Sequence, residues 1–160
     1  MSRLVLEKLK EHFPSTIEVE EEFRGDLSVR VKKDQIVGVS EYLRNDPELR
    51  YDLIVDVCGV DMYRPEARFE VVYHLYSLQN KEYLRLKVEV DESDPVVDTV
   101  SHIWPGANWH ERETFDMYGI TFRGHPDLRR MYMPEDYEYY PLRKDFPLLG
   151  VPDAIPLPRR

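Results

Sequence analysis

The chain has 160 residues and a formal net charge of −9, with 22 Lys and Arg against 31 Asp and Glu. Its length fits one domain, and a hydrophobic fraction of 42% is enough for a buried core. The acidic balance argues against general nucleic-acid binding, because phosphates repel such a surface. The single cysteine, Cys58, excludes an intrachain disulfide, and one thiolate by itself cannot hold a zinc or an iron–sulfur centre. No apolar run approaches the roughly 18 residues of a membrane span, and the charged start does not resemble a signal peptide.

Helical spacing of apolar residues predicts a first helix over residues 2–13, which Pro14 ends. Alternation of apolar and charged residues over 17–31, interrupted by turn residues at 24–26, predicts a β-hairpin. Asp34 is the expected N-cap of a short second helix that ends at 45–47.

Three further strands are expected at 51–60, 69–75 and 84–90. The first is apolar on both faces, which predicts a central position in the sheet. Because the connections are short, neighbouring strands should pair antiparallel. The order of elements predicts an α+β fold of two layers, with helices on one face of a mixed, largely antiparallel sheet of about five strands.

Residues 97–118 are expected to be helical or helix-turn-helix, broken at Pro105-Gly106, and to complete a domain spanning 1–118. Residues 119–160, which we call the tail, hold seven of the 12 prolines and many large side chains. Proline excludes a helix or a central strand there, but a disordered segment is usually poor in aromatic residues. The tail is therefore expected to be extended and to pack on the domain and on partner proteins.

Motifs for nucleotide binding are missing, and Cys58 within an apolar strand indicates a buried structural thiol. His110-Glu111-Arg112-Glu113-Thr114 begins like a zinc-protease helix but lacks the second histidine. His110, Glu113 and Asp116 share a helix face and could form a metal or hydrolase site. An ion-paired face is the stronger interpretation, with Arg112 bound to carboxylates.

Residues 104–147 contain two motifs that resemble the signature of a known family. The first block begins with Glu-Arg-Glu at 111–113. Asp116 follows after two residues and is itself followed by two hydrophobic residues. His125 comes after six further residues, and Arg129 comes after three more. Pro-Leu-Arg-Lys-Asp-Phe-Pro at 141–147 is the second block. Both are similar to the 30 kDa subunit of proton-pumping NADH:quinone oxidoreductase (respiratory complex I). The positions taken as signature and interface residues are Glu111, Arg112, Glu113, Asp116, Tyr118, His125, Arg129, Arg130, Pro141, Leu142, Arg143, Lys144 and Asp145.

The resemblance implies a non-catalytic subunit of the hydrophilic arm, on the cytoplasmic side of the inner membrane. It implies no cofactor or metal in this chain, with flavin and iron–sulfur clusters in partner subunits. The expected partners are the 49 kDa-type subunit, which helps to form the quinone site, and neighbouring iron–sulfur subunits. Such a protein works in a hetero-oligomer, spans no membrane and binds no nucleic acid.

Other functions remain open from the sequence. Membrane-bound nickel–iron hydrogenases and the photosynthetic complex I-like enzyme contain related subunits with weaker forms of the signature. A stand-alone metal enzyme would use His110, Glu113 and Asp116. A soluble adaptor outside any redox complex would use the tail as a segment that folds on binding.

Overall fold

The computed structural model describes residues 2–150, apart from the side chains of residues 2, 3 and 18–21. The end of the predicted tail, residues 151–160, lies outside the described residues. The elements in chain order are α1 (Ser2–His12), β1 (Ile17–Phe23), β2 (Asp26–Val31), η1 (Lys33–Gln35), α2 (Ile36–Asn45), β3 (Leu53–Asp61), β4 (Phe69–Ser77), β5 (Glu82–Val90), β6 (Val96–Asp98), α3 (Ala107–Tyr118) and β7 (Thr121–Arg123).

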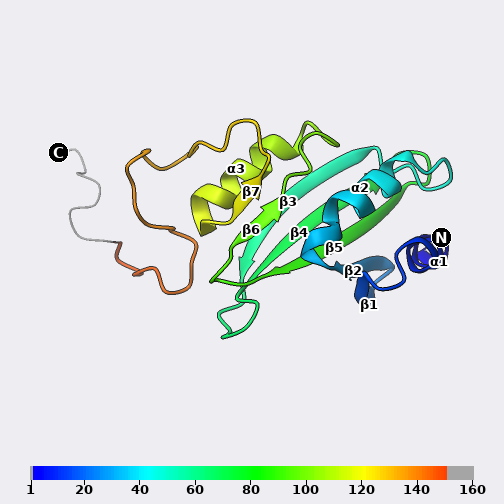
Figure 1. Ribbon diagram of the computed structural model, residues 1–160, viewed down its shortest axis with the longest axis horizontal. Coiled ribbons are helices and arrows are strands. Elements are labelled where there is room, and N and C mark those ends of the chain that lie inside the picture. The colour runs from blue at the N-terminus through cyan, green and yellow to red at the C-terminus, as the bar shows by residue number, and fades with distance from the viewer. Residues whose placement is uncertain (1, 151–160) are drawn as a thin grey trace.

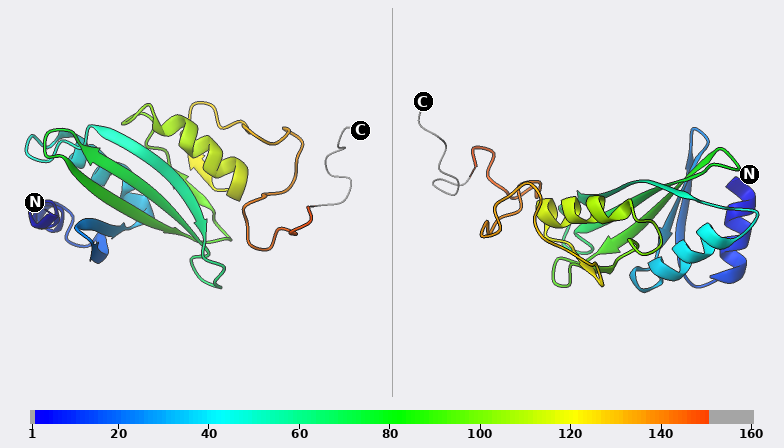
Figure 2. Two further views of the ribbon diagram at one scale, coloured as in Figure 1. Left: turned by 180° about the vertical axis from the view of Figure 1, so that it is seen from behind. Right: turned by 90° about the horizontal axis from the view of Figure 1, so that it is seen from above.

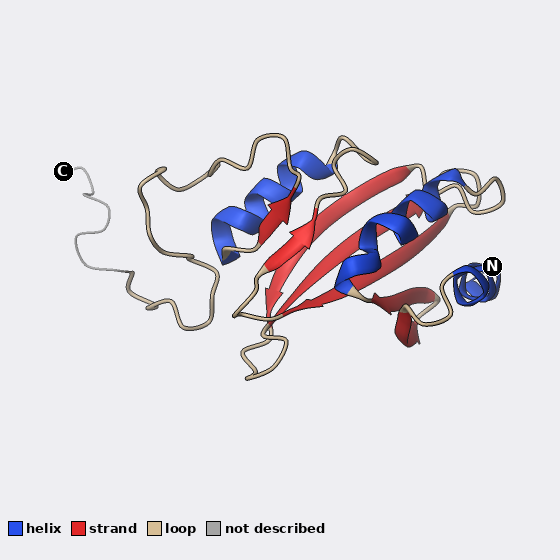
Figure 3. Ribbon diagram, in the orientation of Figure 1, coloured by secondary structure: helices blue, strands red, loops and turns tan. Residues whose placement is uncertain are grey.

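Five strands form one mixed sheet in the order β1-β2-β5-β4-β3 (Figures 1 and 3). The hairpin β1–β2 and the neighbours β3–β4 and β4–β5 pair antiparallel, as their short connections predict. Strands β2 and β5 pair parallel, which makes the sheet mixed. Strands β6 and β7 form a separate two-stranded parallel sheet.

The core lies on one face of the sheet. Inward side chains of paired strands meet there, for example Val57 with Tyr73 and Tyr73 with Leu86. Helix α2 lies in front of the strands in Figure 1 and behind them in the left view of Figure 2, so it covers this face. Helix α3 packs along β3, and the tail leads away from the end of the molecule opposite α1 (Figure 1). The predicted α+β fold with helices on one face is confirmed.

The central position predicted for strand β3 is wrong, because β3 lies at the edge of the sheet. Two of its apolar residues stay open to solvent: Leu53 and Val55 are 45% and 42% exposed. Helix α3 covers the edge instead, and the Thr114 hydroxyl donates to the carbonyl oxygen of Val57 at 3.3 Å. The apolar residues on both faces of β3 therefore do not mean that the strand has a neighbour on each side.

Two other local predictions need correction. Residues 96–98 form strand β6 and are followed by turns, so helix α3 begins only at Ala107, after Pro105-Gly106. Asp34 lies inside the 3-10 turn η1, and the N-cap of α2 is Gln35, whose side chain makes no capping hydrogen bond to the described residues. Over residues 2–150, no helix is both long and apolar enough to cross a membrane.

Candidate functional site between helix α3 and the tail

Helix α3 is buried on two sides, which places it between the rest of the domain and the tail. Glu111 and Asp116 are both fully buried. Because they are five positions apart in a helix of 3.6 residues per turn, their side chains lie on different sides of the helix. Each carboxylate therefore has its own set of partners.

Glu111 faces the loop that leads from β6 to α3. Its Oε1 accepts a hydrogen bond from the backbone N–H of Val100 at 2.8 Å, and its Oε2 accepts one from the Thr99 hydroxyl. Burial raises the pKa of Glu111 from 4.5 to about 7, although both hydrogen bonds oppose this shift. Its ionisable neighbour is the buried side chain of His125, with Nε2 3.8 Å from Oε2.

His125 joins the start of the tail to the start of helix α3. The backbone N–H of Asp127 donates to Nδ1 at 3.1 Å, which leaves the ring proton on Nε2. Nε2 then donates to the carbonyl oxygen of Asn108 at 3.1 Å. Burial lowers the pKa of His125, which favours the neutral ring.

Asp116 binds the middle of the tail. Arg130 donates to Oδ1 at 2.8 Å, and three successive backbone N–H groups donate to Oδ2, from Met131 (2.9 Å), Tyr132 (2.6 Å) and Met133 (3.1 Å). Burial alone would raise the pKa of Asp116, but these hydrogen bonds outweigh it and lower the pKa. The four bonds fold residues 130–133 around one ionised carboxylate, which we call the Asp116 clamp.

Among the described residues, Arg112 pairs with backbone carbonyls and not with a carboxylate as the sequence suggested. It donates to the carbonyl oxygens of Arg129 and Arg130 at 3.1 and 3.4 Å, and it stacks over the Trp109 ring at 5.1 Å from the centroid. A planar guanidinium can bind two backbone carbonyls as readily as a carboxylate, and the tail supplies them here. Arg112 therefore supports the Asp116 clamp from the side.

The second signature block is attached to the far end of the sheet. Asp61, at the end of β3, forms an ion pair with Arg68 at 2.9 Å, and Arg68 also binds Asp145 of the tail at 2.8 Å. The backbone N–H of Lys144 donates to Asp61 at 2.8 Å. Burial alone would raise the pKa of Asp61, but the bonds from Arg68 and from backbone N–H groups lower it to about 2.

Arg143 binds the tail to the domain between the Asp116 clamp and the contacts of Asp61 and Arg68. Its Nε donates to the carbonyl oxygen of Tyr118 at 2.7 Å. The guanidinium lies over the rings of Tyr140 and Phe69, 4.5 and 5.0 Å from their centroids. Arg143 thereby fixes the tail against the C-terminal end of helix α3.

The remaining predicted residues lie nearer the surface. Arg129 forms an exposed ion pair with Asp127 at 2.7 Å, and Glu113 is exposed. The Leu142 side chain is 52% exposed, although its backbone N–H donates to the carbonyl oxygen of Met117 at 3.2 Å. Pro141 and Tyr118 are half-buried.

Sequence reasoning missed Asp61, Arg68 and Thr99, which complete these attachments. Asp61 and Arg68 flank the turn between two predicted strands, where charged residues usually face solvent. Their partner Asp145 is 77 residues from Arg68 in the sequence, so no local pattern relates them.

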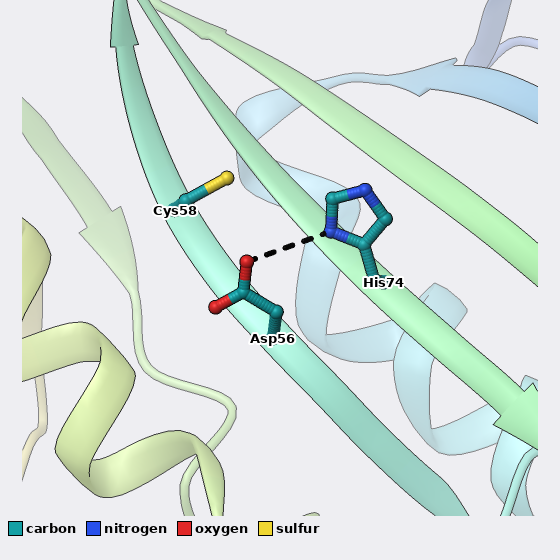
Figure 4. Close-up of side chains that lie close together, drawn as sticks. All are labelled: Asp56, Cys58 and His74. Atoms are coloured by element: carbon teal, nitrogen blue, oxygen red, sulfur yellow. Dashed lines mark ion pairs between the residues drawn. The ribbon is translucent and has the colours of Figure 1, made fainter.

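The predicted metal face is not formed. Asp116 is enclosed in its clamp, and His110 faces Asp56 on β3, with Nδ1 3.2 Å from Oδ1. Within the described part of the chain, one group of three potential ligands comes together elsewhere, on strands β3 and β4 (Figure 4). Its members are Asp56, Cys58 and His74.

We expect Gly119→Ala to lower the free energy of unfolding by about 2–3 kcal/mol, from a strained backbone and a steric clash. Gly119 caps helix α3 with φ +75°, and an added Cβ would lie 2.6 Å from Tyr140 Cζ and 2.8 Å from Arg143 Nη2. Gly25→Ala is the matched control, since φ is +91° there but no described atom outside the turn lies within 4 Å. Urea unfolding measures both. Equal losses would show that the contact with the tail is unimportant.

Comparison with known proteins gives the family. A family model described as the 30 kDa subunit of respiratory-chain NADH dehydrogenase matches residues 29–152, which include helix α3 and both tail attachments. The chain belongs to this family. The resemblance inferred from the two signature blocks is confirmed.

The curated relatives are named as one subunit of NADH-quinone oxidoreductase. The relative from Roseiflexus sp. (strain RS-1) is 56% identical over 144 residues, covering 90% of this chain and 83% of the relative. The subunit of the same name from Geotalea uraniireducens is 48% identical over 149 residues, covering 93% of this chain and 89% of the relative.

Two solved structures share the fold. A trypsin-resistant fragment (1–134) of Nqo5 is 33% identical and has a TM-score of 0.65, covering 80% of this chain and all of the fragment. A chain of an archaeal membrane-bound sulfane sulfur reductase complex is 28% identical with a TM-score of 0.71, covering 92% of this chain and 86% of that chain.

Proposed function

We propose that the chain is a structural and assembly subunit in the hydrophilic arm of proton-translocating NADH:quinone oxidoreductase. Its family and its relatives' names support a place in that enzyme. In this proposal flavin and iron–sulfur clusters belong to neighbouring subunits, and this chain contributes no catalytic residue. The complex lies at the inner membrane, with this subunit on the cytoplasmic side.

The observation that carries the proposal is the two-sided character of the tail. One side is fixed by Asp116, Asp61 and Arg68 through short hydrogen bonds. On the other side, Tyr132 and Leu142 are 59% and 52% exposed. Large apolar side chains exposed on a backbone that hydrogen bonds hold in place are typical of a protein interface, because binding then costs less conformational entropy.

The proposed partner for residues 123–147 is the 49 kDa-type subunit, beside which iron–sulfur subunits lie. This segment is rich in both aromatic side chains and arginines, a composition typical of binding hot spots. The tail would thus hold the quinone-site subunit against the domain, and electron transfer would depend on this chain only through assembly.

We expect Arg143→Ala to lower the yield of assembled complex about tenfold, which corresponds to about 1.4 kcal/mol of docking free energy. The substitution removes the contacts with Tyr118, Tyr140 and Phe69, so the exposed residues lose their fixed arrangement. The measurement is native-gel assembly and NADH:quinone activity in a deletion strain complemented with the variant.

Arg44→Ala is the control, because Arg44 is an exposed arginine at the end of helix α2, outside the proposed docking segment. It should assemble like the wild type. Circular dichroism of the purified chains verifies that both variants are folded. Normal assembly of Arg143→Ala would refute the proposed role of the tail.

A related redox complex is the second candidate, since the sulfane sulfur reductase chain has the same fold. Identity is 28% to that chain and 56% to the Roseiflexus relative, which favours the NADH:quinone enzyme. Affinity purification of the tagged chain from detergent-solubilised membranes distinguishes them. Recovery of flavin-binding subunits with NADH:quinone activity supports the first, and recovery of hydrogenase-type or sulfur-reductase subunits supports the second.

A further inference from the structure

Three side chains with different metal-binding atoms converge on the face of the sheet opposite the core. Asp56 and Cys58 are two residues apart on β3, and Asp56 is paired with His74 on β4. The carboxylate oxygen, the thiol sulfur and a ring nitrogen all lie within 4.8 Å of one another (Figure 4). We call these three residues the sheet-face triad. Because antiparallel pairing sets their positions, the triad is held by the backbone of two strands.

His74 presents a nitrogen that the protein leaves unused. Its Nδ1 is buried, has no hydrogen-bond partner among the described residues and lies 3.8 Å from Oδ2 of Asp56. Buried ring nitrogens are nearly always hydrogen-bonded, so such an atom facing a carboxylate and a thiol calls for an explanation. A cation between the three groups would become the partner of Nδ1 once the ring proton has moved to Nε2.

Arg85 holds the other side of the ring. Its Nε donates to Nε2 of His74 at 3.0 Å, and its Nη1 donates to the Ser28 hydroxyl at 3.0 Å. In this arrangement the ring proton lies on Nδ1. A metal bound to Nδ1 would shift that proton to Nε2, and Arg85 would turn away while keeping its bond to Ser28. Arg85 is therefore a competitor of the metal, and its removal should strengthen binding.

His110 on helix α3 contacts the other oxygen of the same carboxylate. Its Nδ1 lies 3.2 Å from Oδ1 of Asp56, whereas His74 faces Oδ2, so His110 lies next to the triad but outside the group of three. A thiolate, imidazoles and a carboxylate are ligands preferred by Zn²⁺, and Cd²⁺ substitutes for it at sulfur-containing sites. Mg²⁺ and Ca²⁺ prefer sites made of oxygen atoms alone.

We propose that the sheet-face triad binds one Zn²⁺ or a similar divalent transition metal, with the His110 ring turning toward the metal as the fourth ligand. Binding would release the proton of the Cys58 thiol to solvent and leave the imidazoles neutral. The site would connect β3, β4 and helix α3 at the edge of the sheet. It is separate from the residues that attach the tail.

The test is titration of the full chain with Cd²⁺, followed by the absorption of the cadmium–thiolate bond. We expect the wild-type chain to bind one equivalent of Cd²⁺ and the Cys58→Ser variant to show no cadmium–thiolate band. The affinity for Cd²⁺ should fall at least about tenfold in His74→Gln and should increase in Arg85→Gln. His102→Gln is the matched control, since this histidine is exposed and outside the triad, and should bind as the wild type does. Lack of a band in the wild type, or equal affinity of wild type and His74→Gln, would overturn the proposal.

A second measurement needs no variant. Cys58 is the chain's single cysteine, so alkylation reports on this site alone. Zn²⁺ should slow alkylation of the native protein at least about tenfold, because a coordinated thiolate is a poorer nucleophile and less accessible. Alkylation at the same rate with and without Zn²⁺ would also contradict the proposal.

Discussion

Asp116→Ala is expected to lower the free energy of unfolding by about 3–5 kcal/mol, the cost of removing one partner of a buried ion pair. The substitution leaves Arg130, whose side chain is 8% exposed, without its carboxylate. It also leaves the backbone N–H groups of residues 131–133 without an acceptor. Urea unfolding of the purified chain measures the loss.

The same substitution should release the tail. Limited trypsin digestion should cut Asp116→Ala near Arg129 and Arg130 faster than the wild type, since these bonds are no longer held against helix α3. Asp136→Ala is the control, because Asp136 is an exposed carboxylate of the same segment, outside the Asp116 clamp. If both variants unfold and digest like the wild type, the Asp116 clamp does not stabilise the tail.

Glu111→Gln is expected to change how stability depends on pH. The pKa of Glu111 is raised from 4.5 to about 7 on folding, so between these values the folded chain keeps a proton that the unfolded chain has lost. The free energy of unfolding of the wild type should therefore fall as pH rises from about 4.5 to 7. Gln cannot lose a proton, so the variant should be more stable than the wild type by about 3 kcal/mol at pH 8.

The measurement is the difference in unfolding free energy between variant and wild type from pH 4 to pH 8. His125 lies against Glu111 and is present in both proteins, so its own titration largely cancels. The difference should be small at pH 4, where Glu111 is protonated, and should increase with pH. A difference that shifts the other way, favouring the wild type at pH 8, would show that Glu111 is ionised and paired with protonated His125.

These two carboxylates explain why the first signature block has its spacing. Glu111 binds the loop before helix α3 and contacts His125, while Asp116 binds residues 130–133. Two carboxyl groups buried on two sides of one short helix cost desolvation energy, which a helix selected only for stability would avoid. This cost is explained if the two carboxyl groups fix the tail in the conformation that binds the partner subunit.

Local patterns in the sequence were sufficient for most of the elements. Alternation and turn residues located the hairpin β1–β2, and short connections gave the antiparallel pairing of β3, β4 and β5. The same local reasoning failed for residues 96–98, which are a short strand, because their pairing with β7 depends on a segment about 25 residues later. The buried thiol predicted at Cys58 is half-buried, since strand β3 is an edge strand.

The candidate site was likewise predictable from the sequence only in part. The two blocks at 111–129 and 141–147 identify the family from the sequence itself, because they are specific combinations of charged and aromatic residues. Which carboxylate meets which arginine was not predictable: Arg112 binds carbonyl oxygens, and Asp145 binds Arg68. Long side chains can reach many partners, and the nearest one depends on where distant segments pack.

The sequence by itself thus determined the class of fold and the family, and it shows the proline-rich composition of the tail. These depend on residue types and on spacing along the chain, which are local properties. Only the tertiary structure decided the strand order, the burial of Glu111 and Asp116, the attachment of the tail at Asp61 and Arg68, and the meeting of Asp56, Cys58 and His74. Each of these depends on contacts between residues far apart in sequence, whose free energy is set by packing and desolvation after the chain has folded.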